Sequence, residues 1–166
     1  DTNIVCFSDH GEDLNGLYPN DHAGKKLGHS EEEGHGCLLY DTTLKVLFIV
    51  NGEKIPKNRR IESQVRLVDL FPTVLDMFKL KTKKNVDGNS LLPLVHREKI
   101  KELPAYSETF YPEELSKKDK TFKNISSKKS LRILNKHKII FNVKDGKLEV
   151  YDLEKDKDEK RPFVSG

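Results

Sequence analysis

The sequence has little cysteine and no long apolar run, and each shortage excludes a class of protein. Its 166 residues include two cysteines, Cys6 and Cys37, which cannot form a disulfide scaffold. No apolar run approaches the ~20 residues that a membrane-spanning helix needs, so we expect no membrane span. We find no internal repeat, and the length suits one compact domain with its own hydrophobic core.

The first residues carry neither an initiator methionine nor a signal peptide. The chain opens on Asp1, Thr2 and Asn3, so we expect a mature product or a piece of a longer protein. A signal peptide of that longer protein would precede Asp1. The compartment is therefore left open, and export and membrane association of the parent protein both stay in question.

Acidic and basic side chains are unevenly distributed, although the net charge is only +3. Residues 1–50 carry three basic and nine acidic side chains, whereas residues 51–166 carry 27 basic and 18 acidic ones. An acidic first part suits a cation site, and a basic remainder attracts anions. The lysines lack the interleaved aromatic side chains of a nucleic-acid stacking platform, so we expect no nucleic-acid partner.

Hydrophobic patterning predicts an α/β fold in the first part of the chain. The apolar runs at 3–7 and 46–50 show no polar alternation, which favours strands buried on both faces, as in a parallel sheet. Residues 65–80 contain the clearest helix. Asp69 is suited to cap its first amides, and Pro72 then lies in the first turn, where a missing N–H costs nothing.

The second part of the chain is predicted to form a small antiparallel β-sheet. The expected strands span residues 105–109, 131–134, 137–143 and 148–153. Asp145 and Gly146 form a dipeptide that strongly favours a hairpin. We therefore divide the chain into an α/β part, residues 1–100, and an antiparallel β subdomain, residues 101–166.

Polar residues follow the first predicted strand directly. The segment from Ser8 to Asp13 begins where the apolar run stops, and α/β proteins place ligands at the carboxyl ends of buried strands. A simple turn after a strand is the alternative. The loop that follows, residues 14–36, has a length that is typical of functional or disordered loops.

A series of short motifs runs through the chain in a fixed order. The motifs occupy residues 4–12, 34–41, 45–49, 67–76, 87–94, 106–109 and 150–156. The first is an apolar strand that ends in Ser-Asp-His-Gly, and a later one is an Asp-Gly-Asn-Ser-Leu-Leu-Pro turn. Together they resemble the C-terminal portion of the sulfatases, which belong to the alkaline phosphatase superfamily.

The resemblance implies both a fold and an activity. The fold is α/β, part of an alkaline-phosphatase-like parallel sheet followed by a small C-terminal antiparallel sheet with a helix. The activity of the parent protein is that of a metal-dependent sulfuric ester hydrolase. Such enzymes use a divalent metal beside a formylglycine made from Cys or Ser, whose hydrate attacks sulfur. The implied substrate is a sulfate ester, carried for example by a glycan or a lipid.

Two residues match the metal ligands of the family. The resemblance implies that Asp9 and His10 bind the metal, that Gly11 permits the backbone to turn there, and that Glu12 orients His10. Many sulfatases have Asn at the position of His10 and bind calcium, so the resemblance favours calcium. The imidazole of His10 shifts the preference towards manganese or zinc. A turn-forming aspartate and a surface histidine are the alternatives for Asp9 and His10.

His35 matches the position of a Lys or His that contacts the sulfate in many sulfatases. A cation or proton donor is needed there because negative charge builds up on the departing oxygen. The resemblance therefore implies a catalytic and substrate-binding role for His35. His22 and His29 lie in the same loop and are alternatives for substrate binding, and a solvated loop histidine is the other reading of His35.

The family's nucleophile motif, Cys/Ser-x-Pro-x-Arg, is absent from this sequence. Neither Cys6 nor Cys37 has Pro and Arg at the required offsets. The early aspartate pair that completes the metal site in the family is absent as well. We therefore expect the formylglycine to lie in the N-terminal part of the parent protein. This chain alone would supply half of a metal site and would lack full activity.

Two other functions stay open on the sequence. One is a phosphoesterase, phosphonate hydrolase or phosphoglycerol transferase on the same scaffold. The other is a non-catalytic module that binds anions through the basic region 117–138. The sulfatase hypothesis differs from this last one in predicting exposed apolar surface along the strand at 3–8, where neighbouring strands of the sheet would pack.

Overall fold

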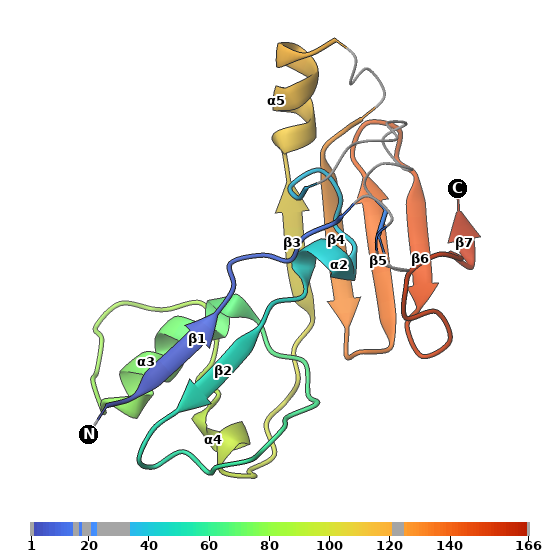
Figure 1. The fold of residues 1–166 in the computed structure, drawn as a ribbon. Helices are drawn as coiled ribbons and strands as arrows, with labels where there is room; N and C mark the ends of the chain where they lie inside the picture. The colour runs from blue at the N-terminus through green and yellow to red at the C-terminus, as the bar shows by residue number, and fades with distance from the viewer. Residues whose placement is uncertain (1, 15–16, 18–20, 23–33, 121–124, 166) are drawn as a thin grey trace.

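Two antiparallel sheets organise the computed structural model, which describes residues 2–14, 17, 21–22, 34–120 and 125–165. The smaller sheet is a ribbon of β1 (Ile4–Phe7) and β2 (Phe48–Asn51). The larger has the order β3-β4-β5-β6-β7 (Figure 1). Its strands are β3 (Ala105–Thr109), β4 (Lys128–Ile133), β5 (His137–Asn142), β6 (Leu148–Asp152) and β7 (Val164–Ser165).

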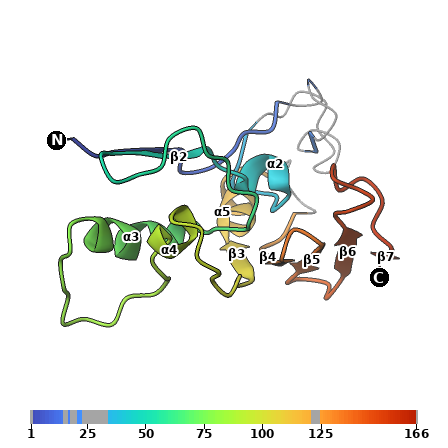
Figure 2. The ribbon, with the colours of Figure 1, turned by 90° about the horizontal axis from the view of Figure 1, so that it is seen from below.

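Short helices accompany both sheets. They are α2 (Asp41–Leu44), the 3₁₀ turn η1 (Leu67–Asp69), α3 (Leu70–Met77), α4 (Leu92–Val95) and α5 (Tyr111–Lys118). Figure 2 shows α3 and α4 in a layer beside the β1–β2 ribbon, while α2 lies over the larger sheet. Among the described residues, no helix has the length and apolar character needed to cross a bilayer.

The α/β class and the C-terminal antiparallel sheet with its helix are confirmed, but the parallel pairing expected of the first two strands is wrong. β1 and β2 run antiparallel, with Val5 opposite Val50 and Cys6 opposite Ile49. The cause is the path of the chain between them. Residues 8–14 leave the ribbon towards the larger sheet, and residues 34–47 run from that sheet through α2 back to the end where β1 stopped, which fixes an antiparallel pair.

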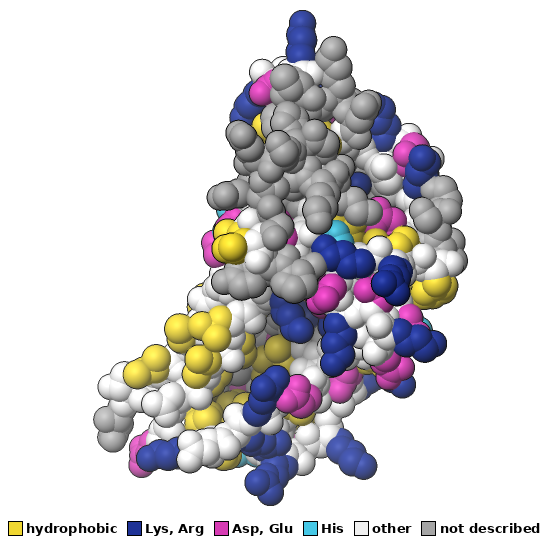
Figure 3. Space-filling model, turned by 45° about the vertical axis from the view of Figure 1, so that its right-hand side comes forward, with side chains coloured by type: hydrophobic (Ala, Val, Ile, Leu, Met, Phe, Trp, Pro, Cys, Tyr) yellow, Lys and Arg dark blue, Asp and Glu magenta, His cyan; other side chains and the backbone are white. Residues whose placement is uncertain are grey.

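The ribbon is also less buried than its sequence predicts. Val5 and Val50 are half-buried on the side of the ribbon that faces the helices, whereas the opposite side is open. On that open side Ile4 is 54% exposed and Ile49 is 52% exposed. Figure 3 shows hydrophobic side chains gathered on this part of the molecule. The sulfatase hypothesis predicted such exposed apolar surface along β1.

The helix expected within residues 65–80 is α3, but Asp69 acts differently from the prediction. Asp69 does precede α3, but its carboxylate makes no capping bond to that helix. It accepts hydrogen bonds from the Arg66 side chain at 2.6 Å and from the Asn89 backbone N–H at 2.9 Å. Asp69 therefore ties the start of α3 to the turn at 85–89, which no local pattern indicates.

The main core lies over the larger sheet rather than under the ribbon. The segment 37–40, just before α2, packs on β5 and β6 and brings residues from both halves of the chain together. The buried apolar cluster consists of Cys37, Leu38, Tyr40, Ile140, Tyr151 and Leu153. The division at residue 100 stays a prediction, and this packing crosses it.

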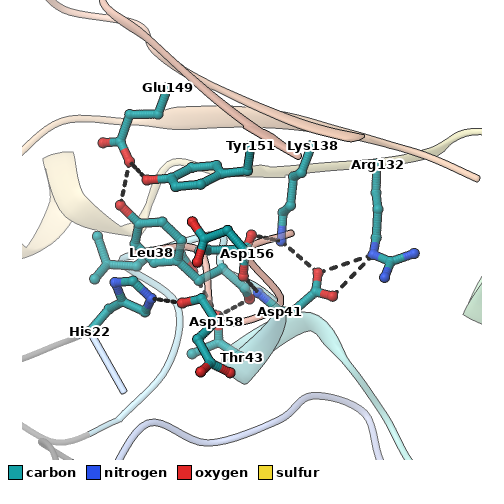
Figure 4. A network of polar contacts seen from close by, with 12 residues as sticks. His22, Leu38, Asp41, Thr43, Arg132, Lys138, Glu149, Tyr151, Asp156 and Asp158 are labelled. Carbon is teal, nitrogen blue, oxygen red and sulfur yellow. Dashed lines mark hydrogen bonds and ion pairs between the residues drawn. The ribbon is translucent and has the colours of Figure 1, made fainter. Parts of the chain in front are cut away.

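A buried network of charges fastens α2 to this sheet (Figure 4). Lys138 of β5 is fully buried, and its ammonium lies 2.8 Å from Asp41 and 3.0 Å from Glu159. Arg132 of β4 binds the same Asp41 carboxylate at 3.1 Å. Burial alone would raise the pKa of Asp41, but the charges of Lys138 and Arg132 outweigh it and hold that pKa below its ordinary value. Asp41 is therefore an ionised anchor for α2.

Two tyrosines share one carboxylate nearby. Tyr40 donates a hydrogen bond to Glu149 at 2.6 Å, and Tyr151 donates to the same oxygen of Glu149. Burial and the Glu149 carboxylate raise the pKa of both hydroxyls far above the ordinary value for tyrosine. Both tyrosines therefore stay protonated and hold the 37–40 segment on β6.

Candidate metal and catalytic site

The polar segment after β1 is held between the ribbon and α2. The backbone N–H of Ser8 donates to the Leu47 carbonyl at 3.1 Å, and the Ser8 hydroxyl accepts from the Leu47 N–H at 3.0 Å. Three residues on, the N–H of Gly11 donates to the Thr43 carbonyl in α2 at 2.9 Å. Asp9 and His10 therefore sit on a backbone that is fixed on both sides.

Gly11 is required by a close approach of two backbones. A Cβ built at this position would lie 2.2 Å from the Thr42 carbonyl oxygen, far inside van der Waals contact. The prediction attributed Gly11 to conformational freedom, yet its φ is not in the left-handed region. The lack of a side chain is what lets the segment rest on α2.

Asp9 and His10 place two ligand atoms side by side. The Oδ1 atom of Asp9 lies 3.6 Å from Nε2 of His10, and the Asp9 side chain is 85% exposed. The other ring nitrogen of His10, Nδ1, lies 2.7 Å from the Gly11 carbonyl oxygen. A carbonyl only accepts, so Nδ1 carries the proton in this contact, and the lone pair of the neutral imidazole is then on Nε2.

His35 is brought to the same place by a pairing across the long loop. Gly34 and Asp13 form an isolated antiparallel bridge, in which the Gly34 N–H donates to the Asp13 carbonyl at 2.9 Å. The imidazole of His35 then stacks on that of His10, with ring centroids 3.5 Å apart and 23° between the planes. The structure thus joins two residues that the sequence separates by the whole loop.

Glu12 contacts His35 more closely than His10. Its Oε2 atom lies 3.1 Å from Nδ1 of His35 but 3.9 Å from Nδ1 of His10. The role of Glu12 in orienting His10 stays a prediction, and the Gly11 carbonyl is the nearer contact of His10 Nδ1, at 2.7 Å. Side chains of Glu12 and His35 are 44% and 46% exposed, so the cluster is open to solvent.

The other two candidate histidines are placed differently. His22 is buried, and its ring stacks on Tyr40 with centroids 3.8 Å apart. Its Nε2 atom lies 2.9 Å from the Asp158 carbonyl, a contact between residues 136 positions apart that no sequence pattern indicates. This surrounding suits a packing role. His29 lies outside the described residues.

Comparison with known families decides the relationship. Residues 36–165 match the family described as "N-sulphoglucosamine sulphohydrolase, C-terminal". The chain belongs to this family. A curated relative of the sulphohydrolase C-terminal segment, arylsulfatase K of Gallus gallus, is 30% identical over 103 residues, which are 62% of this chain. The matched part is 17% of that relative's length.

Solved structures show the same fold for this sulphohydrolase segment. A 2-O GAG sulfatase covers 98% of the chain with a TM-score of 0.71 and 20% identity, over 31% of its own length. The phosphonate monoester hydrolase of Agrobacterium radiobacter covers 98% with a TM-score of 0.68 and 22% identity, again over 31% of its length. The chain therefore has the fold of the C-terminal sulfatase portion in the alkaline phosphatase superfamily.

Proposed function

We propose that this chain is the C-terminal part of a divalent-metal-dependent sulfuric ester hydrolase, and that it supplies half of the metal site. The observation that supports this most directly is the placement of Asp9, His10 and His35. Asp9 and His10 offer an oxygen and a nitrogen 3.6 Å apart, and the His35 ring stacks on His10. Half of a metal site and a leaving-group residue thus share one surface.

The Asp9 and His10 atoms fit a divalent ion. Ligand atoms at about 2.0–2.6 Å from one ion lie at most about 5 Å from each other, and the pair lies well within that range. The hydrogen bond from Nδ1 of His10 to the Gly11 carbonyl leaves Nε2 as the nitrogen that would bind the ion. Calcium is our first proposal, because Asp9 is a hard oxygen ligand, and manganese is the second. When bound, the metal polarises the sulfate ester.

His35 has a separate task. Its Nδ1 lies 3.1 Å from the Glu12 carboxylate, and an imidazole in this place can bind a sulfate oxygen or protonate the departing alcohol. The nucleophile comes from elsewhere in the parent protein, as a formylglycine, since this sequence lacks the motif that forms it. We therefore propose that the chain by itself does not turn over sulfate esters.

The substrate class we propose is a sulfate ester, carried by a glycan as in the 2-O GAG sulfatase. The phosphonate monoester hydrolase has the same fold, so a phosphonate or phosphate ester is the second candidate. A module that binds anions through residues 117–138 has less support. Two basic side chains of that region, Arg132 and Lys138, already bind Asp41.

Calcium titration of this chain tests the metal site. We expect weak binding, with a dissociation constant of about 10⁻³ M, because only two protein ligands are present. Asp9→Asn and His10→Gln should each weaken binding at least tenfold in isothermal titration calorimetry, with manganese titrated in parallel. Glu98→Gln, a change at an exposed carboxylate with no described ion pair, is the control. Equal calcium affinity in Asp9→Asn and the unchanged chain would refute the metal assignment.

Turnover by the full-length parent protein tests the reaction class. With matched 4-nitrophenyl esters we expect the sulfate to be hydrolysed faster than the phosphate and the phenylphosphonate. His35→Asn should lower kcat most for the substrate with the poorest leaving group, because the lost proton donor acts on the departing oxygen. Faster turnover of the phosphonate than of the sulfate would transfer the proposal to the second candidate.

A further inference from the structure

Glu12 belongs to a cluster that the proposed hydrolase does not need. His10, Glu12 and His35 each offer one ligand atom, and these three atoms all lie within 4.8 Å of one another. Glu12 stands between the two imidazoles, at 3.1 Å from Nδ1 of His35 and 3.9 Å from Nδ1 of His10. Asp9 is not a member of this cluster and extends into solvent.

The donor set selects a different kind of metal from the one proposed for Asp9. Two imidazoles and one carboxylate form the set that holds Zn²⁺ at open sites and other borderline first-row cations. Hard cations such as Ca²⁺ prefer six to eight oxygens, which this cluster does not offer. Ligands at about 2.0–2.2 Å from Zn²⁺ lie roughly 3.3–3.6 Å apart in a tetrahedron. The three ligand atoms lie within 4.8 Å of one another, so they reach that geometry once the His35 ring turns out of its stack on His10 and both lone pairs point to one ion.

The backbone of the cluster is held by hydrogen bonds, and its side chains are open to solvent. The Asp13–Gly34 bridge and the bond from Gly11 to Thr43 hold the three backbones together. All three side chains are partly exposed, at 37% for His10, 44% for Glu12 and 46% for His35. A bound ion would therefore have an entry path and room for water at its remaining position.

We infer that His10, Glu12 and His35 form a binding site for a borderline divalent cation, with Zn²⁺ as the best fit, that does not use Asp9. The site is separate from the proposed calcium pair except for His10, which it uses through Nδ1 rather than Nε2. Zinc binding there takes the place of the Nδ1 proton, which leaves Nδ1 together with its hydrogen bond to the Gly11 carbonyl. A zinc ion there occupies both His10 and His35, so it would inhibit the hydrolase. That consequence rests on the proposed function, whereas zinc binding itself does not.

Titration of ZnCl₂ into this chain tests the inference without any turnover. We expect one ion per chain by calorimetry, with a loss of affinity of at least tenfold in Glu12→Gln and in His35→Asn. Asp9→Asn should keep the zinc affinity within twofold. Cys6→Ser and His96→Asn remove other exposed zinc-binding groups and should also leave the affinity unchanged. Circular dichroism of each variant checks that it is folded.

The visible spectrum of bound Co²⁺ provides a second test, because it reports directly on the atoms that bind the metal. Co²⁺ in a tetrahedral site with two imidazoles should give visible absorption bands, and these should disappear in His35→Asn but persist in Asp9→Asn. Unchanged zinc affinity in both Glu12→Gln and His35→Asn would overturn the site. An equal loss in Asp9→Asn would overturn it too, since zinc would then use the calcium pair. Neither result depends on sulfatase activity.

Discussion

Replacing Lys138 with methionine is expected to lower the free energy of unfolding by about 3–5 kcal/mol, the usual cost of removing one partner from a buried ion pair. Lys138 is fully buried between Asp41 and Glu159, at 2.8 Å and 3.0 Å. Methionine fills much the same volume, so the loss isolates the charge rather than a cavity. Urea denaturation followed by circular dichroism measures it.

The control for this variant is Lys136→Met. Lys136 lies two residues earlier on the chain, is exposed, and has no ion pair among the described residues. Its replacement should change the free energy of unfolding by less than about 0.5 kcal/mol. A loss of similar size in both variants would show that the network around Asp41 contributes nothing particular to stability.

The loss in the free energy of unfolding caused by Lys138→Met should become smaller as the pH falls. In the unchanged protein Asp41 has a lowered pKa, so its contribution to stability is present above pH 3.8 and is lost as the pH falls through the folded pKa. Burial already raises the pKa of Glu159, and without Lys138 that pKa would rise further. The pKa of Asp41 would rise as well, because only Arg132 would still oppose the effect of its burial. Acidification neutralises these buried carboxylates, so the variant should lose less stability than the unchanged protein as the pH falls. The deficit should be largest near pH 7 and smallest at acid pH.

The elements set by local chemistry are the ones that the sequence predicts well. The strand expected at 105–109 is β3 with the same bounds. The expected hairpin at Asp145 and Gly146 joins β5 to β6, and Gly146 has a φ of +71°. Apolar spacing and turn residues suffice in both cases, because neighbours along the chain determine these conformations.

The long-range features could not be predicted in the same way. Lys138 stands in an alternating strand, where a lysine ordinarily points to solvent, and its buried partners lie 97 and about 20 residues away along the chain. The antiparallel pairing of β1 with β2 depends on the end of the ribbon at which the chain re-enters it after α2, and a pattern of apolar residues does not predict that. Asp69 likewise bonds to Asn89 rather than to its own helix.

In the candidate site, too, the sequence predicts individual residues but not the contacts between them. Family motifs predicted Asp9, His10 and His35 as separate functional residues, and their roles stay proposals. The stacking of His35 on His10 depends on the Asp13–Gly34 bridge, a contact between one acidic and one glycine residue that carries no sequence signal. The zinc cluster follows from that stacking alone, so only the folded chain indicates it.

Gly11→Ala is expected to destabilise the protein by about 3 kcal/mol, the upper part of the range for overpacking. The new methyl group would meet the Thr42 carbonyl oxygen at 2.2 Å, and that oxygen belongs to α2, which the Asp41 network fixes to the larger sheet. Because α2 cannot move freely, we expect the segment after β1 to be displaced. Urea denaturation again gives the loss.

Gly146→Ala separates this clash from the ordinary cost of replacing a glycine. A Cβ at Gly146 meets nothing within 4 Å, but its φ of +71° strains an alanine by about 1–2 kcal/mol. That variant should keep both metal affinities. Gly11→Ala should lose calcium and zinc binding together, since His10 and Glu12 flank the displaced residue. Retention of either affinity in Gly11→Ala would mean that its metal ligands do not depend on the contact with α2.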